Sequence, residues 1–483
     1  MASKYLTMQF AVRPAVVGRL LADMYGVLAL LTLVPATVAL SMGSVAGPVY
    51  LKVVAAATLL WLAGRILPSP DRVQKNEALC MVALLFISSS LLLCLPMMAY
   101  GIPFIDAWFE SVSGVTTTGL STLSLEQAST AFLFGRAWIQ WVGGIGVVVL
   151  ALAIFVRPGV IAKSMGFSDR EMDDVVGGTR AHAKRVVLIY LLITAIGICA
   201  LYISGASARD AIIHCMTALS TGGFANYPDS LASISNPHLV MINLLCIAGA
   251  VSFHLYYRSI FSAGRGGLLD NQLYALLSLL VVGVCAVSLL LWLEGSSLAG
   301  RDVLTLVVSA QTTAGFSTID IGKLPGSVIV VLCLLMAVGG GAGSTSGGVK
   351  VDRALLVLRG AKMSMLRIGL PDHVYVRGEN GEDSAKMQEA LTLVFWFMAA
   401  LLSSWLVFLV YGYPPLASLF EVTSALATVG LSSGITSEEL PTELKVLLCG
   451  NMILGRLEII AVLVLLAPRT WVGRRRGPAG RKK

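Results

Sequence analysis

The chain has 483 residues, of which 56% are hydrophobic and only 13% are charged, and its formal net charge is +8. With a mean hydropathy of +0.82, this composition excludes a soluble globular protein and predicts a polytopic membrane protein. The eight cysteines and five histidines show no metal-ligand or disulfide spacing, so we interpret them as packing residues rather than as a metal site.

Ten apolar runs of about 20 residues, the length that crosses a bilayer, follow one another along the chain. They lie at roughly 20–42, 49–67, 77–99, 137–156, 186–204, 238–257, 273–294, 327–352, 389–411 and 444–467. No small-residue cleavage site follows the basic residues at the start, so we expect the first run to be a retained span rather than a removed signal. The expected fold class is an all-α polytopic membrane protein with ten transmembrane helices.

A short polar motif recurs four times, after the third, fifth, seventh and ninth of these runs. The four copies, repeats 1 to 4, align on Gly119, Gly223, Gly315 and Gly430. A threonine stands two positions before each glycine, a small residue five before, a hydroxyl residue six before, and a bulky apolar residue one after. Thirteen positions before the glycine stands an aspartate in three copies, but Ala417, close behind two prolines, in the fourth. Such long intervals indicate a duplicated membrane module rather than a solenoid.

Each copy predicts a short re-entrant pore helix that ends in an extended turn. Asp or Pro at the start would cap the helix, and glycine would end it and point carbonyls sideways. Four such turns around one axis would form a ring of carbonyls and threonine hydroxyls at the negative ends of four helix dipoles, which is the construction of a cation selectivity filter. The expected ion-binding residues are Thr116, Thr117, Thr118, Gly119, Ser220, Thr221, Gly222, Gly223, Thr312, Thr313, Ala314, Gly315, Ala427, Thr428, Val429 and Gly430.

The repeats predict four helix–pore-loop–helix modules around one pore, preceded by a further helix pair. The expected parts are the leading pair at 1–70, module 1 at 71–160, module 2 at 161–265, module 3 at 266–365, and module 4 with a basic C-terminal tail at 366–483. The middle residues of the four turns differ from one another.

Lys and Arg are unevenly distributed between the two predicted sides. With the N-terminus inside, 28 of the 35 lie in inner segments, six lie in outer segments, and Arg456 lies within the last run. This asymmetry predicts that both termini are cytoplasmic and that all four motifs enter from the outer face. The net charge then reflects topology and contact with anionic membrane lipids, and no nucleic-acid partner is expected. The inner loops 157–185 and 350–388 are either solvated connectors or a docking face for a cytosolic partner.

A glycine-rich stretch, Val338–Arg353, interrupts the eighth run. It is not a Walker A loop, because Val349 follows Gly348 and Lys350 comes one place late. A break at membrane depth is tolerated where it faces protein or a water-filled cavity, so we expect residues 339–348 to form an intramembrane gate below the filter, with a helix kink as the alternative. The expected gating residues are Gly339, Gly340, Gly341, Gly343, Gly347, Gly348, Lys350 and Arg456.

Three other features have open interpretations. Arg456, a charge within a span, either pairs with Glu458 or a carbonyl, or projects below the filter to limit cation flow or contact the gate. Glu110 and Glu421 stand nine positions before their glycines, where His214 and Leu306 stand in the other copies. The two glutamates either support the pore helices or influence the outer mouth of the pore. The glycines at 143–146 are expected to let helices pack closely.

Taken together, these motifs resemble the Trk/Ktr/HKT superfamily of potassium transporters, most closely its TrkH type, over essentially the whole chain. The resemblance rests on Asp106–Ser121, Arg136–Gly146, Ser220–Phe224, Gln311–Phe316, Gly339–Arg353, Ala427–Leu431 and Gly455–Glu458. In this superfamily a serine in place of the first filter glycine accompanies sodium permeation, so glycine in all four copies implies potassium. The resemblance also implies a homodimer with one pore per subunit and a TrkA-type cytosolic nucleotide-binding ring that regulates the loop. NAD or ATP would then bind that partner. The resemblance further implies that the middle residues of the four turns can differ, because only their backbone would face ions.

The expected function is potassium uptake across the bacterial inner membrane through a gated filter. Obligatory symport with sodium or protons is the alternative within this class. A membrane-embedded enzyme is the alternative from another class. Gly430–Gly434 spells G-x-S-x-G, but it lacks the strand-to-helix turn and base of a nucleophile elbow, and an enzyme is therefore not expected.

Overall fold

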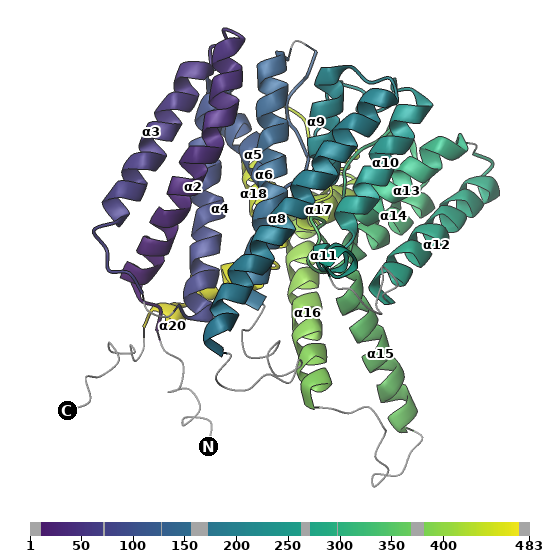
Figure 1. The fold of residues 1–483 in the computed structure, drawn as a ribbon. Helices are drawn as coiled ribbons and strands as arrows, with labels where there is room; N and C mark the ends of the chain where they lie inside the picture. The colour runs from purple at the N-terminus through teal and green to yellow at the C-terminus, as the bar shows by residue number, and fades with distance from the viewer. Residues whose placement is uncertain are drawn as a thin grey trace. The chain divides into compact units, whose positions relative to one another are not determined.

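The computed structural model describes residues 11–70, 73–126, 128–155, 172–261, 271–296, 298–368 and 381–472. Within these ranges every regular element is a helix (Figure 1). Six helices are long and apolar enough to cross a membrane, or up to eight if each of two bent pairs forms one span. The all-helical membrane fold is therefore confirmed, whereas ten spans and five sequence-defined parts stay predictions.

Contacts divide the chain into two units, Met1–Val112 with Leu457–Lys483, and Ser113–Arg456. The first unit contains α2 (Pro14–Ser41), α3 (Gly47–Gly64), α4 (Lys75–Met98), the start of α5 (Phe104–Val115), α19 (Ile460–Leu466) and α20 (Pro468–Trp471). The helices α2 and α3 pack as a hairpin (Figure 1), and Glu77 at the start of α4 accepts a bond of 2.7 Å from Arg13 Nε. This ion pair fixes the chain entering α2 against α4.

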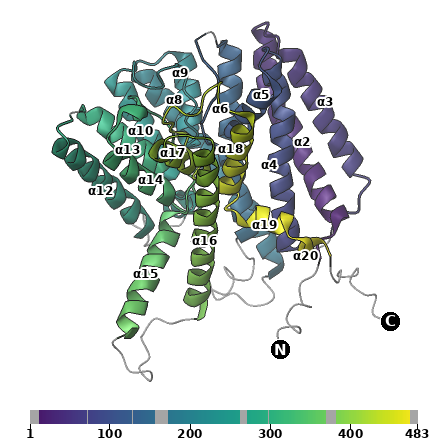
Figure 2. The ribbon, with the colours of Figure 1, turned by 180° about the vertical axis from the view of Figure 1, so that it is seen from behind.

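The second unit contains the remaining helices, several of which are clearest from behind (Figure 2). They are α6 (Thr130–Phe155), α8 (Met172–Ile203), α9 (Ala208–Leu219), α10 (Asn236–Ala250), α11 (Phe253–Phe261), α12 (Asn271–Leu293), α13 (Gly300–Thr312), η2 (Ile321–Lys323), α14 (Gly326–Val338), α15 (Val351–Ile368), α16 (Gly381–Val410), α17 (Pro415–Leu426) and α18 (Thr442–Arg456). The predicted runs at 137–156 and 327–352 correspond to α6 and to α14 with the segment after it.

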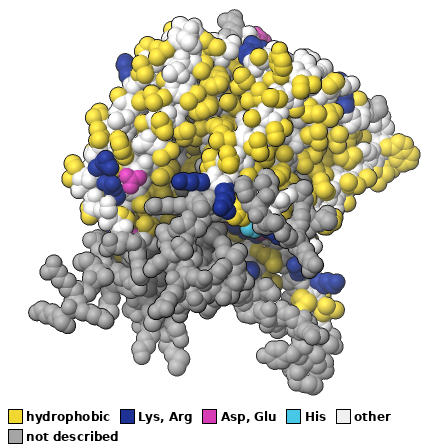
Figure 3. All heavy atoms as spheres, in the orientation of Figure 1, with side chains coloured by type: hydrophobic (Ala, Val, Ile, Leu, Met, Phe, Trp, Pro, Cys, Tyr) yellow, Lys and Arg dark blue, Asp and Glu magenta, His cyan; other side chains and the backbone are white. Residues whose placement is uncertain are grey.

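Hydrophobic side chains dominate the visible surface of the helices (Figure 3), whereas the threonines of the repeats are buried. This is the reverse of a soluble protein, because the apolar faces of a membrane protein meet lipid while its polar groups face one another. Residues 157–171 of the first charged inner loop, residues 369–380 of the second, and the predicted basic tail from residue 473 lie outside the described residues.

Four short helices, α5, α9, α13 and α17, precede the four motifs, as predicted. Pro415 is the first residue of α17, also as predicted. The prediction that aspartate caps the others is wrong in detail: Ser207 is the N-cap of α9, and Asp210 is its third residue. Asp302 likewise stands inside the first turn of α13. An acid there still favours the helix by facing the positive end of its dipole.

Candidate cation-binding site

The turn after each short helix has one backbone conformation in all four repeats. Each has two residues with positive φ, separated by one residue. These are Thr117 (52°) and Gly119 (97°), Thr221 (50°) and Gly223 (77°), Thr313 (57°) and Gly315 (76°), and Thr428 (49°) and Gly430 (95°). The glycines were expected there, but the threonines were not. A β-branched residue in the left-handed region is a genuine outlier that costs of order 1–3 kcal/mol, and such strain is typical of functional sites.

These threonines end the helices in Schellman motifs. In repeat 1 the Thr117 N–H donates to the Gly114 carbonyl at 3.0 Å, and the Thr118 N–H donates to the Ser113 carbonyl at 2.8 Å. The same two bonds recur in the other three repeats. The left-handed position is usually glycine, so the expectation that the motif glycine itself stops the helix was wrong. The glycine is required two residues later, for a different reason.

That reason is close approach between neighbouring repeats. A Cβ on any of the four glycines would overlap a backbone carbonyl oxygen of the next repeat. The pairs are Gly119 with Gly222, Gly223 with Ala314, Gly315 with Val429, and Gly430 with Thr118. The last pair closes the circle, so four glycines and four carbonyls alternate around one ring, which we call the glycine ring. The structure thus brings all four predicted turns together.

One side of the glycine ring opens into a cavity of about 650 Å³. All four glycines line it, with the segments that follow them and with Arg136, Asp229 and Asp320. The hydrogen bond from Lys323 and that from the Gly322 N–H hold the pKa of the Asp320 carboxyl below its usual value. Asp320 is therefore ionised at neutral pH, and it contributes negative charge to the cavity.

The other side of the glycine ring is covered by residues 339–350, which join α14 to α15 and which we call the glycine loop. The Gly347 N–H donates to Thr313 Oγ1 at 2.7 Å, and Thr221 Oγ1 lies 3.3 Å from Thr345 Oγ1. The Gly348 N–H donates to the Ala427 carbonyl at 3.1 Å. The loop thus contacts three of the four repeats directly at their threonine side.

The remaining two threonine hydroxyls have a different environment. Thr117 Oγ1 and Thr428 Oγ1 are buried and have no hydrogen-bond partner among the described residues. A buried hydroxyl without a partner lowers the stability of the folded protein, because no hydrogen bond replaces those it made to water. A dehydrated cation would supply that missing partner.

The predicted gating residues are not all at the ring. The Gly341 N–H donates to the Ala250 carbonyl at 2.9 Å, and the Gly343 carbonyl accepts from the Phe253 N–H at 3.0 Å. Gly340–Gly343 therefore lie against the break between α10 and α11, whereas the Gly339 carbonyl accepts from Gln311 Nε2 of α13. Only the second half, including Gly347 and Gly348, meets the threonines.

Two positively charged side chains donate hydrogen bonds to neighbouring carbonyls of the glycine loop. Arg456 Nη1 donates to the Thr345 carbonyl at 2.6 Å, and Lys350 Nζ donates to the Ser346 carbonyl. The second guanidinium nitrogen, Nη2, donates to the Gly143 carbonyl of α6 at 3.2 Å. Arg456 was expected either to bind a carbonyl or Glu458, or to contact the gate. The structure combines the two, because the carbonyl that it binds belongs to the glycine loop.

Two acids hold the segments that follow the turns. In repeat 4 the Glu421 carboxylate accepts from Ser432 Oγ at 2.8 Å, from the Ser433 N–H at 2.8 Å and from Thr436 Oγ1. In repeat 2 the corresponding residue is His214, and its Nδ1 lies 3.4 Å from Nε2 of His238. There the acid is Asp210, one helical turn earlier.

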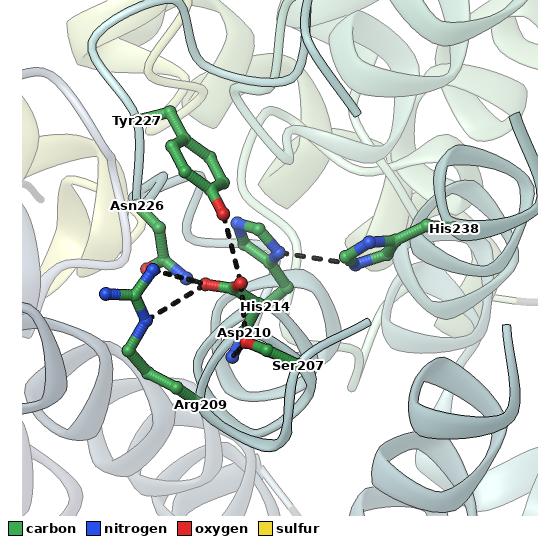
Figure 4. A network of polar contacts seen from close by, with 7 residues as sticks. All are labelled: Ser207, Arg209, Asp210, His214, Asn226, Tyr227 and His238. Carbon is green, nitrogen blue, oxygen red and sulfur yellow. Dashed lines mark hydrogen bonds and ion pairs between the residues drawn. The ribbon is translucent and has the colours of Figure 1, made fainter. Parts of the chain in front are cut away.

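Figure 4 shows the Asp210 carboxylate between residues of α9 and of the segment after the turn. It accepts from Asn226 Nδ2 at 2.7 Å and from the Tyr227 hydroxyl at 3.0 Å, while Ser207 Oγ donates at 2.6 Å. The sequence held a signal for this exchange: repeat 2 has Asp210 and His214 where repeat 4 has Ala417 and Glu421.

The hydroxyl residue six positions before the glycine also differs among repeats. Ser113 Oγ accepts from the Gly119 N–H at 3.0 Å, and Ser424 Oγ accepts from the Gly430 N–H at 3.1 Å. Thr217 Oγ1 instead bonds back along α9 to the Ile213 carbonyl at 3.1 Å. The Phe224 N–H of repeat 2 donates to Gln140 Oε1 at 3.1 Å, a contact that the sequence motifs did not reveal.

Comparisons with known proteins give a consistent result. The family model TrkH, described as a cation transport protein, matches residues 53–292 and 298–471. The Trk system potassium uptake protein TrkI of Halomonas elongata is 34% identical over 441 residues, which cover 87% of this chain and 88% of that protein. TrkH of Salmonella typhimurium, also a Trk system potassium uptake protein, is 31% identical over 389 residues, covering 76% and 79% respectively. The crystal structure of the potassium transporter TrkH from Vibrio parahaemolyticus covers 95% of this chain and 100% of that chain, with a TM-score of 0.82 and 26% identity.

Proposed function

Because the chain belongs to the TrkH family of cation transport proteins, we propose that it takes up potassium across the bacterial inner membrane through the glycine ring. The family transports cations, so the chain is a multi-pass membrane transporter and not an enzyme. Potassium is the cargo of the similar proteins named above. Both termini of this chain would be cytoplasmic, as the distribution of Lys and Arg predicts.

The observation that carries this proposal is the closed ring of four glycines and four carbonyls. A selectivity filter works by replacing the ion's water shell with carbonyl oxygens. Four helices end at this ring, so the negative ends of their dipoles favour a cation there. The buried hydroxyls of Thr117 and Thr428, which lack partners among the described residues, would complete the shell on the inner side.

We assign the gate to the glycine loop. The loop occupies the space below the threonines, and the bond that the Gly347 N–H donates to Thr313 Oγ1 uses a lone pair that an ion would need. The loop also holds the Thr221 hydroxyl, which donates to Thr345 Oγ1. Conduction would require the loop to move away, and Arg456 would resist that movement through its bond to Thr345. A TrkA-type cytosolic partner that binds NAD or ATP would shift this equilibrium, and two copies of the chain would form a homodimer with one pore each.

The filter is tested by Gly119→Ser in proteoliposomes, with the permeabilities to potassium, rubidium and sodium measured from reversal potentials. The new side chain would meet the Gly222 carbonyl and distort the ring, so we expect the potassium-to-sodium ratio to fall about tenfold, the equivalent of about 1.4 kcal/mol.

Gly205→Ser is the matched control for this test, because Gly205 has φ of 96° with open space around it. It carries the same backbone strain without a contact to the ring. An unchanged ratio in the Gly119 variant, or an equal change in both variants, would contradict the filter. A reversal potential that moves with an imposed sodium or proton gradient would instead indicate coupled transport.

The gate is tested by deleting Gly340–Gly347. The deletion removes the segment that lies under the threonines, so we expect basal rubidium uptake without the cytosolic partner to rise about tenfold or more, as for the loss of about 1.4 kcal/mol or more of closed-state stability. Arg456→Ala should act in the same direction with a smaller effect. Uptake that stays at the wild-type basal level in both variants would reduce the loop to a helix kink.

A further inference from the structure

Gln140 of α6 is a buried residue that reaches repeat 2 from outside it. Its side chain is fully buried, and its amide makes two bonds to the backbone. Nε2 donates to the Gly222 carbonyl, and Oε1 accepts from the Phe224 N–H at 3.1 Å. The two bonds span Gly223, so one rigid amide plane holds both sides of the ring glycine.

The bond to Gly222 distinguishes one carbonyl of the glycine ring from the other three. Gly222 supplies one of the four ring carbonyls, and Gln140 is a side-chain donor to it. In the described part of the chain, no side chain donates to the other three ring carbonyls, which belong to Thr118, Ala314 and Val429. In repeats 1 and 4 a serine hydroxyl of the repeat itself accepts from the glycine N–H and leaves the ring carbonyl untouched.

Gln140 also explains a sequence difference that the motifs left open. The middle residue of the turn is Thr, Gly, Ala and Val in repeats 1 to 4. A Cβ at Gly222 would lie 2.5 Å from Gln140 Cδ and 2.6 Å from its Oε1. Glycine is therefore required in repeat 2 by the glutamine beside it. The expectation that this position varies freely because only its backbone matters does not hold for repeat 2.

The helix that carries Gln140 is itself fixed against the turn. Arg136, one helical turn earlier on α6, places its guanidinium carbon 3.9 Å from the centre of the Phe224 ring. A Cβ on Gly144 would lie 2.8 Å from Ser220 Cβ, so the predicted close packing of the α6 glycines is present here. Contacts on both sides of Gln140 leave its amide little freedom to follow a moving carbonyl.

We infer that Gln140 is a specificity-determining positioning residue, which fixes the Gly222 carbonyl and so sets how well the glycine ring discriminates among dehydrated monovalent cations. This inference rests on the proposed function of the ring. A smaller ion such as sodium needs the carbonyls to close inward, and a carbonyl held by an amide resists that movement. Without the amide donor, the ring would adapt to sodium at a lower cost.

The first test is Gln140→Leu, which keeps the volume and removes both bonds. We expect the potassium-to-sodium permeability ratio in proteoliposomes to fall about fivefold, the equivalent of about one net hydrogen bond. Gln140→Glu, measured at alkaline pH where the carboxylate is ionised, keeps the acceptor for the Phe224 N–H but has no donor for Gly222. It should lower the ratio as well, whereas a wild-type ratio in this variant would mean that Gln140 only supports the turn.

Asn243→Leu is the matched control. Asn243 is another buried amide, on α10, and it donates to Thr305 Oγ1 at 2.9 Å rather than to a ring carbonyl. Both leucine variants should lower the midpoint of thermal unfolding in detergent, but only Gln140→Leu should change the ion ratio. An equal change of the ratio in the Asn243 variant would overturn the inference, because it would show a general loss of structure.

A double-mutant cycle with Gly222→Ala gives a second, independent measurement. The alanine alone should lower the ratio, because it collides with the Gln140 amide. In Gln140→Ala/Gly222→Ala that collision is gone, so the double variant should be no less selective than Gln140→Ala alone. Effects that multiply would mean that the two residues act separately and would overturn the inference.

The filter and the glutamine can fail separately. If the wild type takes up no potassium, or if Gly119→Ser leaves the ratio unchanged, the proposed filter fails. If those two results are as expected and Gln140→Leu has the wild-type ratio, the filter stands and only the role of Gln140 is refuted.

Discussion

Repeats 2 and 4 build the same turn with different side chains. In repeat 4 the carboxylate that holds the segment after the turn is Glu421, and Ser424 accepts from the glycine N–H. In repeat 2 the carboxylate is Asp210, one helical turn earlier, and Gln140 of another helix accepts from the turn in place of the repeat's own hydroxyl.

The comparison separates what is fixed in each repeat from what is exchangeable. The left-handed threonine, the left-handed glycine and the two Schellman bonds occur in both repeats. The supports also hold different backbone atoms, because Ser424 accepts from the N–H of the ring glycine and Gln140 accepts from the N–H of the residue after it. Each support still satisfies a polar group of the turn that would otherwise lack a partner. Aligned positions within the repeats are therefore not always equivalent in what they do.

The largest effect on this comparison is expected from removing the carboxylates. Glu421→Ala leaves several buried donors of the segment after the turn without an acceptor, and we expect it to lower the free energy of unfolding by about 3 kcal/mol. Asp210→Ala should cost about 2 kcal/mol by the same argument. Thermal unfolding in detergent and rubidium uptake would measure both effects.

An exchange variant sharpens the same prediction. Asp210→Ala/His214→Glu moves the acid of repeat 2 to the position that it has in repeat 4, so uptake and thermal stability should recover in part relative to Asp210→Ala. The exposed Glu439 offers a control, because Glu439→Gln should leave both measurements at wild-type values. A double variant no better than Asp210→Ala would show that the two supports are not interchangeable.

A smaller effect is expected from the hydroxyl residues. Ser424→Ala removes the acceptor of the Gly430 N–H, and we expect the potassium-to-sodium ratio to fall about threefold to fivefold, as for a lost hydrogen bond of about 1 kcal/mol or slightly less. Thr217→Val is the matched change in repeat 2, because it removes a hydroxyl that bonds along its own helix, and it should leave the ratio unchanged. Reversal potentials would measure both variants. Equal losses of selectivity would remove the distinction drawn between these two repeats.

Much of the architecture could be predicted from the sequence, because the length of an apolar segment and the spacing of its residues determine local structure. Long apolar runs predicted the membrane class, and the recurrence of Thr-x-Gly predicted four short helices followed by four similar turns. Glycine at the aligned positions predicted positive φ there, but the close approach at Gly119 and its counterparts was seen only in the structure. These inferences needed only the period of a helix, the length of a bilayer and the conformational freedom of glycine.

The tertiary structure alone decided which residues meet across helices. Gln140 stands 82 residues before Gly222, and Arg456 lies 111 residues after Thr345, so no local pattern could pair them. The left-handed threonines were also beyond sequence reasoning, since an isolated β-branched residue avoids that conformation and accepts it only where surrounding contacts stabilise the strained turn. The chain itself determined that there would be four turns, and the packing of distant helices decided how each is held.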